Sequence, residues 1–132
     1  MYNAGGFIAS CLESILRQTV SPAEYEIIVV DDGSTDGSAE QVETRFPGVR
    51  ILRSLENLGF ARAANLGARE ARGRWVIFLN VDTYLAEDWL AQLLAVAESD
   101  ERIGGVQTVQ IFPWRRLEGA AENMPYYLDL CP

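Results

Sequence analysis

The 132-residue sequence predicts an α/β fold, a layered domain with a largely parallel sheet, from three observations. Segments whose apolar residues recur at helical spacing alternate along the chain with short, nearly continuous apolar runs. The two strongest runs, residues 25–30 and 75–79, are rich in β-branched and aromatic residues, and each is followed by acidic or amide residues. The composition, 48% hydrophobic and 23% charged, suits one globular domain with its own core.

The first half of the chain predicts two helices and two strands. One apolar stripe favours a helix over residues 7–18, which a Ser-Pro pair ends. A strand buried on both faces is expected over residues 25–30, before an Asp-Asp-Gly turn. A short helix over residues 38–46 stops at a Pro-Gly pair, and residues 49–52 form the next expected strand.

The second half predicts two more helices and two more strands. Residues 61–71 are rich in Ala and Arg, which favour a helix. Residues 75–79 predict a strongly buried strand, and residues 86–98 repeat apolar residues on one helical face. The last expected strand is residues 105–112, and no clear period follows it.

Charge and composition exclude several classes of function. The chain has no Lys and no His, and its 11 Arg face 19 carboxylates for a formal charge of −8. This excludes a phosphate loop that needs Lys, a Ser-His or Cys-His nucleophile and a His-ligated metal. It also excludes a receiver domain, whose chemistry needs a Lys, and the acidity argues against nucleic-acid binding.

The cysteines and the apolar runs indicate a cytoplasmic chain. Cys11 and Cys131 have no paired spacing, so we expect reduced thiols, with Cys11 on the apolar stripe and in the core. No apolar run is long enough to span a bilayer, and the opening residues do not have the pattern of a signal peptide.

Acidic and amide side chains follow the two strongest predicted strands. Asp31 and Asp32 come after one strand, and Asn80 and Asp82 come after the other. Ligands of open parallel sheets bind beyond the carboxyl ends of the strands, and carboxylate oxygens suit Mg²⁺ or Mn²⁺. The alternative is that residues 32–37 form only a turn and a helix cap, which their composition also favours. Because two strands deliver acids to one edge, we favour a shared cleft.

Four blocks of sequence, taken together, resemble the family-2 glycosyltransferases with the GT-A fold. The blocks are Tyr2-Asn3 with residues 11–18, the Asp-Asp-Gly-Ser-Thr-Asp-Gly-Ser segment of residues 31–38, Asn-Leu-Gly-Phe-Ala-Arg-Ala-Ala-Asn-Leu-Gly at residues 57–67, and Asn-Val-Asp-Thr at residues 80–83. They occur in the family's order over about residues 2–112. The resemblance implies a Rossmann-like three-layer sandwich with a mostly parallel sheet, truncated at both ends and lacking the strand before Tyr2.

The resemblance also implies roles for single residues. Asp32 would contact the nucleotide base with Tyr2 near it, and Asp82 would ligate a divalent metal, Mg²⁺ or Mn²⁺, that bridges the diphosphate. Asn80 stands where many members have Asp, and its amide could bond a ribose hydroxyl without adding charge. The expected nucleotide-binding residues are Tyr2, Asn3, Asp32, Ser34, Arg62, Asn65, Asn80 and Asp82.

The function implied is sugar transfer from a UDP- or dTDP-sugar to an acceptor hydroxyl, inverting and metal-dependent. Residues 1–112 would be the incomplete nucleotide-sugar-binding domain and residues 113–132 the start of the acceptor side. The general base is expected beyond Pro132, so the chain alone would be inactive. Because the missing strand leaves a central position of the sheet unfilled, the chain alone would also be poorly stable. The acceptor would be a glycan or a lipid-linked molecule of cell-wall or polysaccharide biosynthesis, and the full-length protein would associate with the inner membrane face. The alternative is a non-catalytic nucleotide-binding or interaction module.

Overall fold

The structure is a computed structural model that describes residues 1–108. The chain divides into two compact units, Met1–Gln92 and Leu93–Pro132. In the described part of the second unit, the last residues of a helix lead into a turn where the Arg102 guanidinium pairs with the Asp100 carboxylate at 2.6 Å. None of the helices described is long and apolar enough to cross a lipid bilayer.

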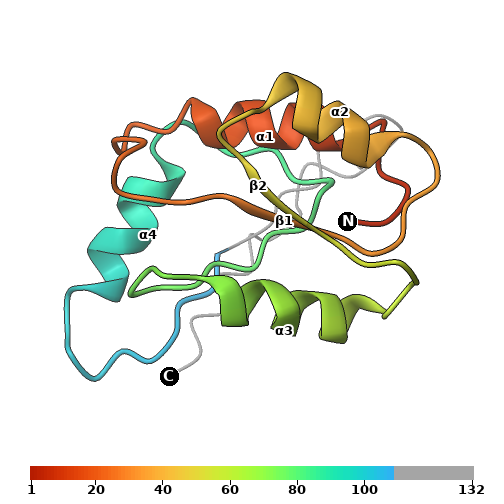
Figure 1. The fold of residues 1–132 in the computed structure, drawn as a ribbon. Helices are drawn as coiled ribbons and strands as arrows, with labels where there is room; N and C mark the ends of the chain where they lie inside the picture. The colour runs from red at the N-terminus through yellow and green to blue at the C-terminus, as the bar shows by residue number, and fades with distance from the viewer. Residues whose placement is uncertain (109–132) are drawn as a thin grey trace, which may run out of the picture. The chain divides into compact units, whose positions relative to one another are not determined.

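Residues 1–108 form six elements, in the order helix, strand, helix, strand, helix, helix (Figure 1). They are α1 (Ile8–Leu16), β1 (Ile28–Asp31), α2 (Ser38–Arg45), β2 (Arg50–Arg53), α3 (Phe60–Glu70) and α4 (Trp89–Ala97). All four predicted helices and the first two predicted strands are confirmed, with ends that differ by at most three residues from the patterns.

The first unit is layered around a parallel strand pair. β1 and β2 pair in register, with Val29 opposite Ile51, and α2 makes the crossover that parallel strands require. Figure 1 shows α1 and α2 on one face of the strands and α3 on the other. A core cluster packs between α1, α2 and the strands, and its buried members are Ile8, Leu12, Val29, Val42 and Phe46.

Among residues 1–108, the other edge of β1 is paired at its carboxyl end. The Met1 nitrogen donates to the Val30 carbonyl oxygen, and the Asp32 N–H donates to the Met1 carbonyl oxygen at 2.8 Å. This is the alternating pattern of a parallel ladder, so Met1 lies in the neighbouring strand position, on the edge away from β2.

The predicted strand over residues 75–79 is wrong. Within residues 1–108 the sheet has two strands, β1 and β2, and residues 75–79 are irregular. Val76, Ile77 and Phe78 are 44%, 41% and 61% exposed, so the predicted burial is wrong as well. Apolar composition favours a strand only where a neighbouring strand completes its ladder, and here no strand lies hydrogen-bonded beside the segment.

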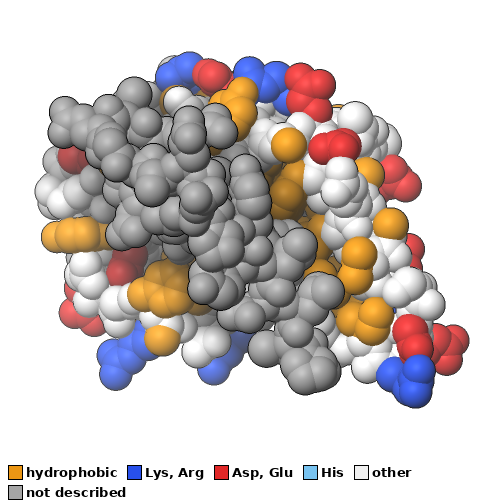
Figure 2. Space-filling model, turned by 180° about the vertical axis from the view of Figure 1, so that it is seen from behind, with side chains coloured by type: hydrophobic (Ala, Val, Ile, Leu, Met, Phe, Trp, Pro, Cys, Tyr) orange, Lys and Arg blue, Asp and Glu red, His pale blue; other side chains and the backbone are white. Residues whose placement is uncertain are grey.

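The strand predicted over residues 105–112 is not formed in its described part, since residues 105–108 are irregular. The rest of that predicted strand, residues 109–112, and the predicted acceptor-side segment 113–132 lie outside the described residues. Figure 2 shows apolar side chains open to view at several places on one face, with charged side chains toward the margins.

Candidate functional site

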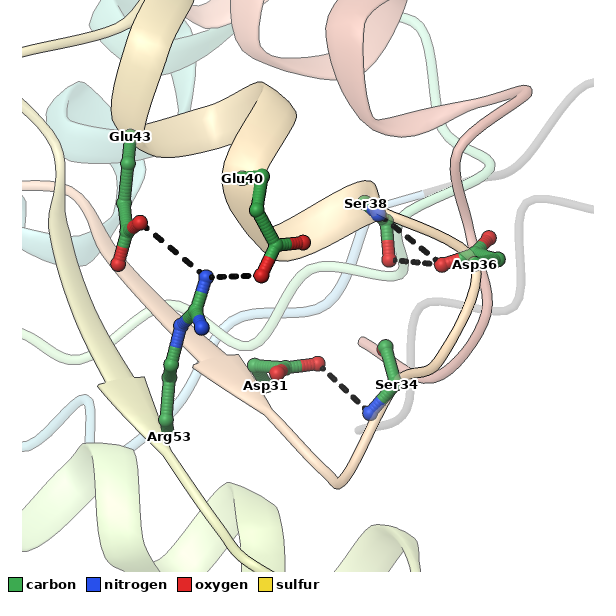
Figure 3. Close-up of polar contacts among 7 residues, drawn as sticks. All are labelled: Asp31, Ser34, Asp36, Ser38, Glu40, Glu43 and Arg53. Carbon is green, nitrogen blue, oxygen red and sulfur yellow. Dashed lines mark hydrogen bonds and ion pairs between the residues drawn. The ribbon is translucent and has the colours of Figure 1, made fainter.

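The turn after β1 buries two adjacent carboxylates. Asp31 and Asp32 are 3% and 5% exposed, and the Ser34 N–H donates to Asp31 Oδ1 at 3.2 Å (Figure 3). Gly33 turns the chain with φ at +79°, and a Cβ at this position would lie 3.0 Å from the carbonyl carbon of Glu56. Only glycine meets both demands without strain, so this turn is specified by its sequence.

The Asp32 carboxylate connects the end of β1 to the start of α3. Its Oδ1 accepts the Leu58 N–H at 2.7 Å, and its Oδ2 accepts the Gly59 N–H at 3.0 Å. Gly59 is the residue before α3, so the carboxylate also faces the positive end of that helix. Asp32 therefore holds two loops at the carboxyl edge of the sheet together.

The N-terminal loop is fastened to the loop that follows β1. The Asn3 N–H donates to Ser34 Oγ at 3.0 Å, and the Thr35 N–H donates to Asn3 Oδ1 at 2.9 Å. Asn3 has a positive φ of +46°, a conformation that Asn tolerates better than most residues. Asn3 and Ser34, both predicted to bind nucleotide, thus contact each other across the two loops.

Asp36 completes this junction and binds Ser38, the first residue of α2. Its Oδ1 accepts the Ser38 N–H and hydroxyl at 3.0 and 2.5 Å, and its Oδ2 accepts the Gly5 N–H at 3.0 Å (Figure 3). The Ser38 hydroxyl, followed by the Gly5 N–H, lowers the pKa of Asp36 below its ordinary value. Further along α2, Glu40 and Glu43 pair with the guanidinium of Arg53, the last residue of β2, at 3.0 and 3.1 Å (Figure 3).

Residues 80–83 form a turn beside α1. The Thr83 N–H donates to the Asn80 carbonyl oxygen at 3.2 Å, and the Cys11 thiol donates to the same oxygen at 3.8 Å. Cys11 is a buried free thiol, as its place on the apolar stripe predicted. Burial raises the pKa of Cys11, and the negative charge of Asp82 adds to the rise.

The N-terminal loop and this turn enclose a pocket of about 350 Å³. It is lined by Tyr2, Asn3, Ala4, Phe7, Asn80, Val81 and Asp82. Among the described residues, the lining contains one carboxylate, two amides and two aromatic rings, and no cation. Asp82 is exposed, and across residues 1–108 its carboxylate makes no hydrogen bond or ion pair, so it is free to take a ligand.

The pocket brings together four of the eight predicted site residues, Tyr2, Asn3, Asn80 and Asp82. Ser34 reaches the pocket only through its contact with Asn3, and Asp32 does not line it. Arg62 and Asn65 are exposed on α3 and are also absent from the lining. The shared cleft expected for Asp32 and Asp82 is therefore not the pocket that the structure forms.

Three lining residues, Ala4, Phe7 and Val81, were not predicted. Phe7 was assigned to the apolar stripe of a helix, but it directly precedes α1 and is 60% exposed. The sequence contained one indication that Phe7 lines the pocket, namely its position five residues after Tyr2, because a loop that contributes one pocket residue commonly contributes its neighbours.

The lining can hold a divalent cation only together with a ligand. Mg²⁺ typically takes one or two carboxylates and completes its shell with substrate phosphates and water. Asp82 provides one carboxylate, and Asn80 adds an amide oxygen without charge. In the part of the chain that the structure describes, no group of three or more Cys, Asp or Glu could hold a metal alone.

An α/β unit with a parallel strand pair and a pocket beside its carboxyl edge is the arrangement of a GT-A glycosyltransferase, and solved structures agree. S. aureus TarS 1-349 in complex with UDP-GlcNAc matches with a TM-score of 0.68 and 29% identity, covering 74% of this chain and 29% of the TarS 1-349 chain. The mannosyltransferase PcManGT from Pyrobaculum calidifontis, in complex with GDP-Man and Mn²⁺, matches with a TM-score of 0.71 and 29% identity, covering 76% of this chain and 31% of PcManGT.

The chain matches Glycosyl transferase family 2 over residues 1–127, and it belongs to that family. Glycosyltransferase EpsJ of Bacillus subtilis is 36% identical over 104 residues, which are 76% of this chain and 29% of EpsJ. The poly(ribitol-phosphate) beta-glucosyltransferase of Bacillus spizizenii is 33% identical over 94 residues, which are 68% of this chain and 15% of that enzyme. The chain thus spans less than a third of the length of these relatives.

Proposed function

We propose that this chain binds the nucleoside-diphosphate part of a sugar donor, with UDP or dTDP as the nucleotide, in the pocket of about 350 Å³. The observation that supports this most is that one pocket gathers Tyr2, Asn3, Asn80 and Asp82 from the two ends of the first unit. Tyr2 offers a ring for the base, and the two amides offer donors and acceptors for ribose and phosphate.

A divalent cation, Mg²⁺ or Mn²⁺, belongs to this proposal because of the charge of the lining. A diphosphate brings negative charge to a pocket that has one carboxylate and no cation. A cation between Asp82 and the phosphate oxygens removes this repulsion, and it would stabilise the charge of the leaving diphosphate. PcManGT was solved in complex with both GDP-Man and Mn²⁺, which supports a divalent cation here.

For the whole protein we infer inverting transfer of the sugar to a hydroxyl of a glycan or lipid-linked acceptor. The names of relatives such as the poly(ribitol-phosphate) beta-glucosyltransferase support polysaccharide or cell-wall acceptors. Such acceptors favour a place at the cytoplasmic face of the inner membrane. Among residues 1–108 the pocket lining has one carboxylate, Asp82, which this proposal assigns to the metal, so we expect the 132-residue chain alone to bind the donor without transferring its sugar.

Calorimetric titration of the chain with UDP, dTDP and GDP, each with and without Mn²⁺, tests the proposal. We expect UDP or dTDP to bind, with an affinity that Mn²⁺ increases. Asp82→Ala should abolish the Mn²⁺-dependent part, whereas Asn80→Asp, which adds a second carboxylate to the lining, should increase it.

Glu87→Ala is the matched control, because it removes the same charge from an exposed residue that does not line the pocket. Equal Mn²⁺-dependent affinity in Asp82→Ala and Glu87→Ala would refute the metal assignment. Absence of binding by all three nucleotides would refute the proposed function.

A further inference from the structure

Two buried polar side chains face the segment that follows the turn of residues 80–83. Ser14 of α1 is 0% exposed, and Gln18, which follows α1, is 8% exposed. Burying a hydroxyl or an amide costs free energy unless hydrogen bonds replace the water that each group loses. Both side chains find their partners largely in residues 85–90, about 70 residues further along the chain.

Ser14 holds the beginning of this segment. Its Oγ accepts the Leu85 N–H at 3.1 Å and donates to the Cys11 carbonyl oxygen at 2.7 Å. Leu85 is itself buried at 6% exposure, so its N–H would lack a partner without the Ser14 hydroxyl. The first anchor thus lies three residues after Asp82.

Gln18 holds the rest of the segment. Its Nε2 donates to the Ala86 carbonyl oxygen at 2.6 Å and to the Ser14 carbonyl oxygen at 3.1 Å. Its Oε1 accepts the Leu90 N–H at 2.8 Å, in the first turn of α4. Both amide hydrogens and the amide oxygen are therefore used, which fixes the orientation of the side chain and of the two backbone groups that it binds.

The turn that contains Asp82 is anchored on both sides by the α1 region. The Cys11 thiol contacts the Asn80 carbonyl oxygen before Asp82, and Ser14 binds Leu85 after it. Among residues 1–108, no strand pairs with residues 75–79, and the described contacts on either side of this turn are those that side chains of the α1 region make. The position of the Asp82 carboxylate in the pocket then depends on these side-chain contacts.

We propose that Ser14 and Gln18 are positioning residues that hold the Asp82 carboxylate at the pocket. Their effect on a bound metal and diphosphate rests on the proposed function, whereas their effect on the order of the turn does not. Neither residue lines the pocket, so each acts through the backbone of residues 80–90 and not on the ligand.

Ser14→Ala and Gln18→Met test the proposal, because they remove the hydrogen bonds with little change of volume. Ala39→Gly is the control, since it weakens α2, which makes none of these contacts. In the chain without ligand, we expect amide hydrogen exchange of Leu85 in Ser14→Ala, and of Leu90 in Gln18→Met, to accelerate about tenfold beyond the control. Nitrogen-15 relaxation should show increased motion of residues 80–83 in both variants.

With Mn²⁺ and whichever of UDP and dTDP the wild-type chain binds, the dissociation constant should rise about 10- to 100-fold, as it does when groups that orient a metal ligand are removed. The affinity for the free nucleoside should stay unchanged, because it does not involve Asp82. Unchanged order of residues 80–83, or a loss of Mn²⁺-dependent affinity no greater than in Ala39→Gly, would overturn the proposal. If the wild-type chain binds neither nucleotide, the proposed function fails, and the relaxation of residues 80–83 alone decides the positioning role.

Discussion

Removal of the Asp32 carboxylate should cost the fold about 3 kcal/mol. Asp32 accepts the Leu58 and Gly59 N–H groups at 2.7 and 3.0 Å and is 5% exposed. A hydrogen bond to a charged group contributes about 1.5–3 kcal/mol, and the lower value applies because both bonds are only partly buried. Two such bonds give about 3 kcal/mol for Asp32→Ala. Asp32→Asn keeps one acceptor oxygen and should lose about half as much.

Urea denaturation measures this loss. With a slope of about 1–3 kcal/mol per molar urea, the midpoint of Asp32→Ala should fall by about 1–3 M at unchanged slope. Amide exchange at Leu58 and Gly59 should accelerate in parallel, since these groups lose their acceptor. Glu87→Ala, at an exposed position, should stay within about 0.5 kcal/mol of the wild type. A loss below about 1 kcal/mol in Asp32→Ala would refute the view that this carboxylate holds the two loops together.

Three further predictions concern single positions. Gly33→Ala should cost at least about 1–2 kcal/mol in the same urea experiment, because φ is +79° and the new Cβ meets the backbone. Because the pKa of Asp36 is lowered in the folded chain, its carboxylate stabilises the fold above the ordinary pKa of 3.8, and this stabilisation is lost as the pH falls through the lower pKa of the folded chain. Asp36→Asn should therefore reduce the dependence of the free energy of unfolding on pH in the acid range. An unchanged dependence on pH would contradict this prediction. In a Cys131→Ser variant, iodoacetamide should modify Cys11 far more slowly than a free thiol, because burial raises its pKa, and fast modification without urea would show that the α1 region opens readily.

The local patterns predicted most of the first unit because its elements depend on nearby residues. α1, α2 and α3 follow from helical spacing and end signals, and β1 and β2 follow from short apolar runs. Residues 75–79 have the same kind of run but form no strand. Their conformation depends on what lies beside them in the sheet, which a local pattern does not contain.

Part of the pocket lining could be predicted from the resemblance to a known family. Tyr2, Asn3, Asn80 and Asp82 were expected from the resemblance, and they line one pocket. The hydrogen bonds of Asp32 were not predictable, because they depend on the path of the chain between β2 and α3. The sequence likewise contains no local sign that Ser14 and Gln18 bind residues far along the chain, since their place in a helical pattern would suit many partners.

The anchors of the turn that contains Asp82 have a consequence for the order of folding. The contacts made by Ser14 and Gln18 close loops of 68 to 72 residues, whereas the ion pairs of Arg53 with α2 close loops of 10 to 13 residues. Long loops cost more chain entropy to close, so the β1–α2–β2 unit should form first and the segment 80–90 should dock last. By the same reasoning, this segment should detach before the strands separate, in a partial opening that removes the carboxylate from the pocket while the core stays folded.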